Sequence, residues 1–189
     1  MGFFDDLPPL PPPADVPQIE REPWHGPPIG WIGGYVPWRL LHDENSEHCS
    51  VITEFEAFPT GVGFSVVTRY RPGSPDADPR TRMSDIRRTD GPRFGVGFAD
   101  GRKALSSAWF SGSGSEEPVN PVLVAQGGGG GPGEFRMRFW LWPLPPPGPV
   151  TFVSAWPART GKERTVAADS SELVAAATEA RQLWQDAHE

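Results

Sequence analysis

Residues 134–142 read EFRMRFWLW, and this stretch decides the fold. Two sets of side chains alternate along it: Phe135, Met137, Phe139 and Leu141 in one set, and Arg136, Arg138, Trp140 and Trp142 in the other. Because successive side chains of a β-strand point to opposite faces, this pattern predicts a strand with one apolar face. The proline-rich residues 143–149 follow, and residues 151–156 alternate again. Together they predict a β-hairpin over residues 134–157, built across a stiff proline joint.

Other short strands lie on both sides of this hairpin. Residues 48–58 and 64–71 alternate as well, and the Pro-Thr-Gly turn at 59–61 predicts a second hairpin. Its first strand is expected to place Val51, Thr53, Phe55 and Ala57 on one face. Further strands are expected at residues 36–41, 94–98, 103–110, 121–125 and 164–167. About six to nine short strands without intervening helices indicate a mainly β fold, an antiparallel β-sandwich or partly open barrel.

The two ends of the chain differ from this β region. Near the C-terminus, Asp169 and Glu172 have the spacing of a capping box. Apolar residues follow at steps of three and four, which predicts a single C-terminal α-helix over residues 169–188: Leu173, Ala177, Ala180, Trp184 and Ala187. Residues 1–30 are rich in proline and form either an extended strap or a loose tail. Residues 31–168 are the expected β domain.

Length, charge and composition restrict the class of protein. A chain of 189 residues with net charge −7 and a pI of about 5.1 is expected to form one acidic domain. The scattered Lys and Arg argue against nucleic-acid binding. The sequence has neither a signal peptide nor 18 consecutive apolar residues, so we expect a cytoplasmic protein without membrane contact. Cys49 is the sole cysteine and cannot form an internal disulfide.

Three segments together resemble a known set of sequences. They are MGFFDDLPPLPPP at residues 1–13, FEAFPTGVGFSVV at 55–67 and GGGGGPGEFRMRFWLWPLPPPGPVTFVSAWP at 127–157. In this combination the chain resembles a family of proteins from high-GC Gram-positive bacteria that has no assigned activity. The resemblance implies a bacterial, intracellular origin and carries over no catalytic residue.

The segment HDENSEHC, residues 42–49, holds the residue types that bind metals or act as nucleophiles. Its imidazole, carboxylate and thiolate side chains are the candidate ligands: His42, Asp43, Glu44, Glu47, His48 and Cys49. They are nearly consecutive on a strand-to-strand turn, so neighbours such as His48 and Cys49 are expected to point apart. The segment therefore favours a solvated turn, and the chain has no Gly-x-Ser-x-Gly nucleophile motif. We predict no catalytic, cofactor-binding or metal residue.

Two further motifs have ordinary explanations. The glycines at residues 127–131 precede a proline and a strand instead of a helix, which predicts a flexible connector and not a phosphate loop. Glu54 and Glu56 could do acid–base chemistry, but alternating acids are common on a wet strand face. As an alternative, they could face Arg69 and Arg71 across the hairpin as cross-strand ion pairs.

The candidate binding surface is the set Arg136, Arg138, Trp140 and Trp142, which we name the Arg/Trp face. Arg and Trp are enriched at binding hot spots. Either the chain's own proline-rich segment or helix covers this face, or a partner does. The leading hypothesis is a non-enzymatic interaction module that binds another protein or an extended peptide through this face or its proline-rich segments. The alternatives are a small metal protein or enzyme centred on residues 42–49, and a structural or self-associating subunit.

Overall fold

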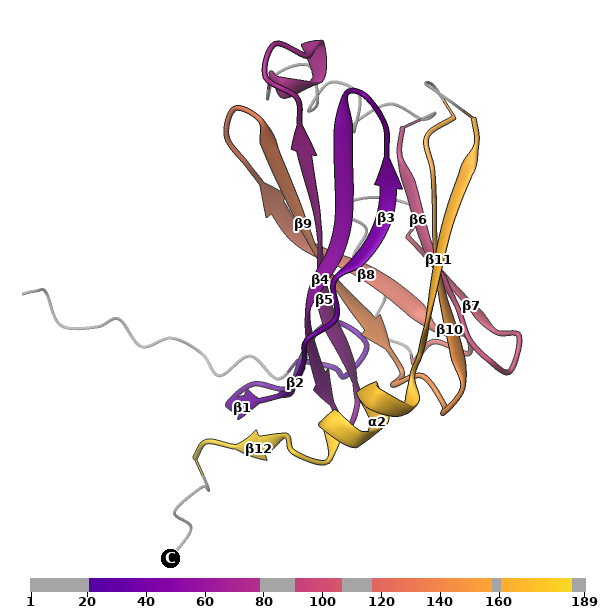
Figure 1. Cartoon of the computed structure of the whole chain (residues 1–189). Helices are drawn as coiled ribbons and strands as arrows, with labels where there is room; N and C mark the ends of the chain where they lie inside the picture. Colours follow the sequence, from indigo (N-terminus) through magenta and orange to yellow (C-terminus); the bar gives the residue numbers. More distant parts are fainter. Residues whose placement is uncertain (1–20, 79–90, 107–116, 158–160, 185–189) are drawn as a thin grey trace, which may run out of the picture.

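The computed structural model describes residues 21–78, 91–106, 117–157 and 161–184. In this part of the chain the fold is mainly β, every paired strand is antiparallel, and one helix lies near the C-terminus (Figure 1). The predicted fold class is therefore confirmed, in its sandwich-like form and without a closed barrel. No described helix is long and apolar enough to cross a membrane.

The larger sheet has the order β2-β4-β5-β9-β8, and β3 pairs with β4 beside β2. Its strands are β2 (Gly34–Val36), β3 (Leu40–Glu44), β4 (His48–Phe58), β5 (Gly61–Tyr70), β8 (Val122–Gly129) and β9 (Glu134–Trp142). The predicted strand at residues 36–41 is thus two short strands, separated by residues 37–39.

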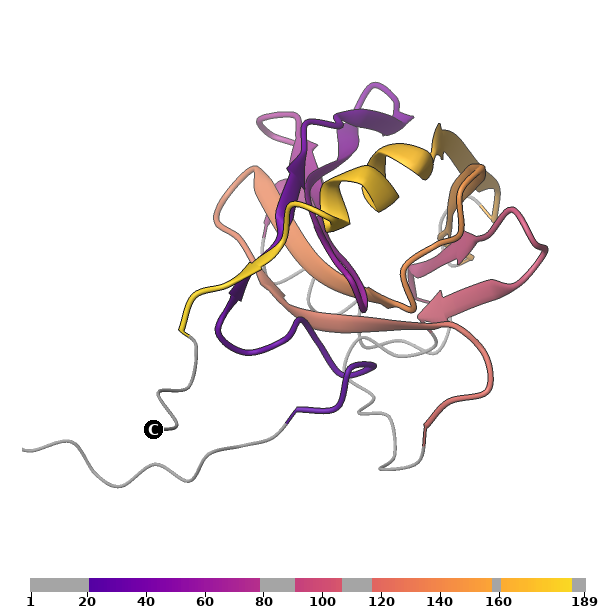
Figure 2. The ribbon, with the colours of Figure 1, turned by 90° about the horizontal axis from the view of Figure 1, so that it is seen from below.

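The smaller sheet has the order β11-β10-β6-β7. Its strands are β6 (Arg93–Gly97), β7 (Lys103–Ser106), β10 (Pro149–Ala155) and β11 (Glu163–Asp169). The two sheets face each other, and α2 (Ser171–Ala177) lies across one end of the space between them (Figure 2). The predicted strand at 103–110 is described only as far as residue 106.

Aromatic rings fill the space between the sheets. Phe64 stacks on Phe139 and Phe55 at centroid distances of 5.6 and 5.5 Å, and Phe139 stacks on Phe94 at 5.1 Å. Phe152 of the smaller sheet meets Phe64 edge-on at 5.5 Å. Each such ring removes about 150–250 Å² from water, so these residues supply much of the energy that holds the two sheets together.

The predicted hairpin over residues 134–157 is wrong, although both of its strands exist. β9 pairs with β5 and β8, whereas β10 pairs with β6 and β11 in the other sheet. Residues 143–148 therefore cross between sheets instead of closing a turn. Four of these six residues are prolines, which have no N–H for a hairpin ladder. Alternation identifies a strand but not its neighbour.

The hairpin of β4 and β5 is confirmed, but the predicted faces of β4 are not. The register shifts between Thr53 and Glu56, and Glu54 has a φ of 59°. Such a β-bulge inserts one residue and reverses the alternation beyond it. Ile52 and Phe55 consequently both point into the core, and both are fully buried.

The predicted helix over residues 169–188 is too long. Helix α2 ends at Ala177, and the two-residue strand β12 (Arg181–Gln182) then pairs with β1 (Trp31–Ile32). The capping box does not form either. Glu172 Oε2 instead accepts a hydrogen bond from Trp38 Nε1 at 3.0 Å, and Asp169 Oδ1 accepts the Ser171 N–H at 2.9 Å. Of the predicted stripe, Leu173 and Ala177 are buried and Trp184 is exposed; Ala187 lies outside the described residues.

The predicted flexible glycine connector is wrong for three of its five residues. Strand β8 runs on through Gly129, and its glycines pair with β9 residues 136–138. At Gly128 a Cβ would lie 2.7 Å from the Arg136 carbonyl oxygen and 2.7 Å from Met137 Cε. The close approach of β9 at Gly128 therefore leaves no room for a side chain there, and the φ of 131° at Gly127 also favours glycine.

Candidate functional site

Trp140 of the Arg/Trp face lies on the outer surface of the larger sheet but is fully buried, with 0% of its surface exposed. Its ring meets Phe58 of β4 edge-on at 5.7 Å. Its indole Nε1 donates a hydrogen bond of 2.9 Å to the carbonyl oxygen of Pro23. A residue far away in the sequence thus closes the aromatic half of the predicted face.

Residues 21–28, which we name the covering segment, lie over this half. Trp24 is 7% exposed and contacts Trp142 edge-on at a centroid distance of 6.0 Å. Gln126 of β8 donates its Nε2 to the His25 carbonyl oxygen at 2.7 Å. Residues 21–28 therefore pack on the sheet and include a turn, in which the His25 N–H donates to the Glu22 carbonyl at 2.9 Å. Residues 1–20 lie outside the described residues, so the strap or tail over residues 1–30 stays a prediction.

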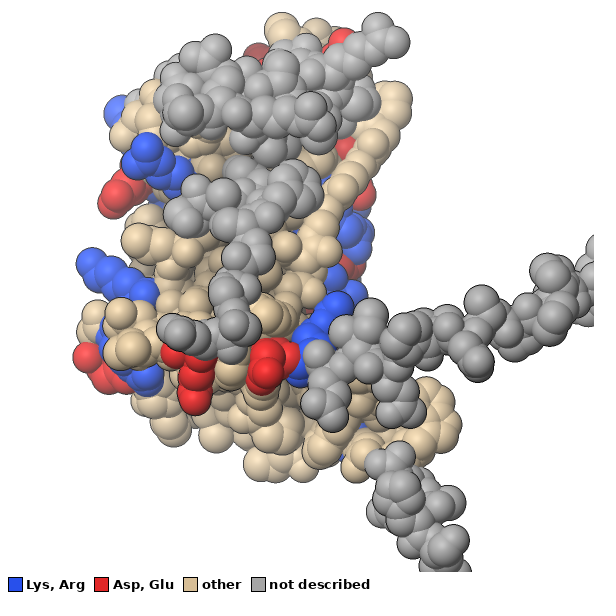
Figure 3. Space-filling model, turned by 180° about the vertical axis from the view of Figure 1, so that it is seen from behind, with Lys and Arg blue, Asp and Glu red and all other residues tan. Residues whose placement is uncertain are grey.

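The arginine half of the face is exposed and ion-paired. Arg136 donates to the carboxylate of Glu54, and Arg138 Nη2 lies 3.2 Å from Glu56 Oε2. These pairs span three strands, because β5 presents only small residues between them: Gly63 and Ser65. Acidic and basic side chains likewise lie beside one another on the side of the molecule in Figure 3.

The predicted pairing of Glu54 and Glu56 with Arg69 and Arg71 is therefore wrong. Arg69 Nε instead lies 3.2 Å from Glu134 Oε2 of β9. Burial alone would raise the pKa of Glu54, but hydrogen bonds from Ser65 and Arg136 outweigh it and lower that pKa. Because these pairs are exposed, each is worth at most about 1 kcal/mol.

The segment 42–49 forms the β3–β4 hairpin, and His42 is buried at its base. His42 Nε2 lies 2.7 Å from Ser154 Oγ of β10, and its ring meets Phe94 edge-on. Its Nδ1 is buried and finds no hydrogen-bond partner among the described residues. Burial lowers the pKa of His42, Asp43 opposes that effect, and Arg164 adds to it.

Asp43 joins three strands at the same end of the sandwich. Its Oδ2 lies 3.0 Å from His48 Nε2, and its Oδ1 accepts a 2.8 Å hydrogen bond from Arg164 Nε of β11. Burial would raise the pKa of Asp43, but the bonds from His48 and Arg164 lower it overall.

The candidate ligands of residues 42–49 do not converge. Asp43 and His48 meet, His42 bonds to Ser154, and Cys49 is a half-buried free thiol. The described residues hold no group of three or more side chains that could bind a metal. Sequence reasoning missed the contact of His42 with Ser154, since no local signal links residues 112 positions apart.

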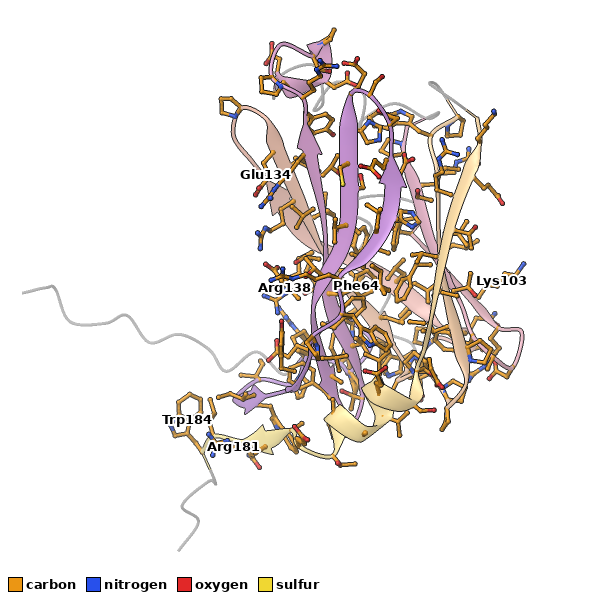
Figure 4. All side chains as sticks on the ribbon, viewed as in Figure 1. Phe64, Lys103, Glu134, Arg138, Arg181 and Trp184 are labelled. Atoms are coloured by element: carbon orange, nitrogen blue, oxygen red, sulfur yellow. The ribbon has the colours of Figure 1, made fainter. Side chains whose placement is uncertain are left out.

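Sequence reasoning also missed an exposed apolar element, the terminal ribbon, which we define as residues 29–32 and 181–184. It contains β1 and β12, and the Leu183 N–H donates to the Gly30 carbonyl at 2.7 Å. Four of the eight exposed large hydrophobic residues in the described chain lie on it: Ile29, Ile32, Leu183 and Trp184. Trp184 and Arg181 project away from the sheets, whereas Phe64 points between them (Figure 4).

Comparison with known proteins gives no relative from which a function could be transferred. No family model matches the chain, and neither a curated protein nor a solved structure is significantly similar to it. The resemblance to a bacterial family stays a prediction.

Proposed function

We propose that the protein is a non-enzymatic interaction module that recognises a proline-containing segment in a turn conformation on the aromatic half of the Arg/Trp face. One observation carries the proposal. Side chains of two neighbouring strands, Trp140 and Gln126, donate hydrogen bonds to alternate carbonyls of the covering segment, those of Pro23 and His25.

This pattern of donors suits a peptide ligand. The two accepting carbonyls belong to a turn, in which the His25 N–H donates to the Glu22 carbonyl at 2.9 Å. Proline at the second position of such a turn presets its φ angle, which lowers the entropy lost on docking. Tryptophan side chains are also typical of surfaces that bind proline-rich segments.

The covering segment also provides a side-chain anchor. Trp24 is inserted against Trp142, and it is the most buried large side chain of residues 21–28. Buried tryptophans are frequent hot spots, because one ring supplies much of the apolar area of an interface. The ligand expected from this geometry is therefore a Pro-Trp pair at the centre of a turn.

The segment can be exchanged without unfolding the sheets. None of residues 21–28 belongs to a strand, so their release breaks no sheet ladder. Segments held in this way open at a lower free-energy cost than the core does. Because the segment is tethered, it competes at an effective concentration of about millimolar. A partner peptide must therefore bind well, or bind when the covering segment has been displaced.

A titration with the chain's own sequence tests the proposal. The probe is a labelled peptide of residues 21–28, REPWHGPP, and the receptor is the full chain carrying Trp24→Ala. We expect fluorescence anisotropy to report saturable binding that is tighter than binding to the wild type, where the intact segment competes. A peptide with alanine in place of its tryptophan is the matched control and should not bind.

A second variant locates the site. Gln126→Ala removes one donor, and we expect about fivefold weaker binding for one lost hydrogen bond of about 1 kcal/mol. Absence of binding to a folded Trp24→Ala chain would refute the proposal. If Gln126→Ala leaves the affinity for the peptide unchanged, the peptide binds at another site. If Trp24→Ala prevents folding, Trp24→Leu keeps an apolar anchor for the same titration.

A further inference from the structure

Gly26 is a second buried residue of the covering segment, beside the anchor Trp24. A Cβ built on Gly26 would lie 3.2 Å from Oε1 of Gln126 on β8, which is closer than ordinary van der Waals contact. The φ of Gly26 is not positive, so its backbone conformation would accept other residues. Space alone therefore excludes a side chain where the segment approaches the sheet.

A β-bulge sets the position of Gln126. The register of β8 against β9 shifts between Ala125 and Gly127, so Gln126 is the extra residue between two pairs of the ladder. A bulge of this kind re-aims the side chain of its extra residue. Gln126 Nε2 donates to the His25 carbonyl oxygen at 2.7 Å. Because this bond holds the amide, Oε1 cannot move away from Gly26 without weakening it.

We propose that the peptide site selects glycine as well as tryptophan, so that its ligands are segments of the class Pro-Trp-x-Gly. This inference rests on the proposed function and narrows its ligand. Trp24 is the buried anchor, and Pro23 and His25 supply the two carbonyls that accept hydrogen bonds. The residue between tryptophan and glycine contributes its main-chain carbonyl, so several residue types suit that position.

The side chain of Arg21 offers a competing reason for the glycine. Its Nη1 lies 2.6 Å, and its Cδ 3.1 Å, from the same Cβ position on Gly26. Arg21 belongs to the covering segment, so this clash would concern the conformation of the ligand and not the receptor. Arg21 is exposed and can swing into solvent, whereas the Gln126 amide is held by its hydrogen bond. The test therefore removes Arg21 first.

Two peptides and two receptors test the selection. The labelled peptides cover residues 21–28 with Arg21→Ala, one with Gly26 and one with Gly26→Ala. The receptors are the full Trp24→Ala chain with and without Gln126→Ala. Fluorescence anisotropy should show about tenfold weaker binding of the alanine peptide where Gln126 is present, as for other overpacked contacts. In the Gln126→Ala receptor the two peptides should bind equally, because the clashing atom is gone.

Two results of this titration would overturn the inference. One is a preference for glycine that survives Gln126→Ala, which would mean that the ligand itself requires glycine. The other is equal binding of the two peptides to the receptor that keeps Gln126. If neither peptide binds, the proposed function fails, and the selection of glycine is then decided in the intact chain.

Hydrogen exchange at the His25 N–H, which donates to the Glu22 carbonyl, reports opening of the covering segment in the intact chain. In an Arg21→Ala background, Gly26→Ala should speed this exchange about tenfold. With Gln126→Ala added, the same substitution should leave the rate unchanged or slow it, because alanine restricts the detached chain. An equal effect of Gly26→Ala in both backgrounds would overturn the inference.

Gly129→Ala is the matched control for the intact chain. Gly129 is also on β8, and a Cβ there would meet no atom within 4 Å. We therefore expect this substitution to leave exchange at the His25 N–H unchanged. Faster exchange in Gly129→Ala would show that any added methyl group on this side of the molecule loosens the segment, and would equally overturn the selection at Gly26.

Discussion

Trp140 and Trp184 both lie on the surface of the β-sandwich, yet one is fully buried and the other is 69% exposed. The difference is whether another segment reaches the ring. Pro23 and Trp24 cover Trp140 and its neighbour Trp142, whereas the ring of Trp184 lies beside Gly30, which has no side chain to cover it. The same residue type thus completes the packing in one region and is left largely exposed in the other.

Replacing each of the two tryptophans by alanine should give the largest difference in stability between the two regions. Trp140→Ala leaves a cavity under the covering segment and an unpaired Pro23 carbonyl, so we expect a loss of about 3–5 kcal/mol in the free energy of unfolding. Trp184→Ala should change it by no more than about 0.5 kcal/mol, as for other exposed residues. Urea unfolding measures both, and similar losses would show that the two rings do not differ in their cover.

Trp24→Ala removes the cover and leaves Trp140 in place. We expect a loss of about 2 kcal/mol, less than for Trp140→Ala, because the covering segment can detach without opening the core. Hydrogen exchange should show faster exchange at residues 21–28, with β4 and β5 unchanged. Faster exchange throughout the sheets would mean that the segment is an integral part of the core.

His42 is a polar side chain that is buried in the fold, as Trp140 is. Burial lowers its pKa, so the unfolded chain binds the proton more readily than the folded chain does. Stability should therefore fall as the pH drops below about 6.5, the usual histidine value, by at most about 1.4 kcal/mol per pH unit. Unfolding at several pH values should show a shallower dependence for His42→Gln. An equally steep dependence in that variant would assign the effect to other groups.

The smallest effect is expected at the arginine half of the Arg/Trp face, which nothing in the described chain covers. A double-mutant cycle on Glu54 and Arg136 should give a coupling below about 1 kcal/mol. The coupling should disappear in about 1 M salt, where charges are screened within roughly 3 Å. A larger coupling that persists in salt would indicate that this half is shielded from water as well.

The sequence predicted the features that depend on residues close together in the chain. The alternation in β9, the turn between β4 and β5 and the strand at Phe94 identified real strands. The bulge at Glu54 was not predictable, because it depends on how β4 meets β5 and leaves no mark in the alternation. Contacts between segments far apart in the chain could not be predicted from local sequence patterns either. β12 replaces a predicted helix because it pairs with β1, and the cover of Trp140 comes from Pro23.

The order of the strands in the larger sheet also bears on the rate of folding. Two residues join β4 to β5, so that hairpin can form early, whereas β5 must wait for β9 until residues 71–133 have been drawn together. Closing so long a loop costs chain entropy before any pairing repays it, and folds of this kind need milliseconds to seconds. The late partner of β5 is the strand that carries the Arg/Trp face. The surface that receives the covering segment therefore exists only after the slow step of folding.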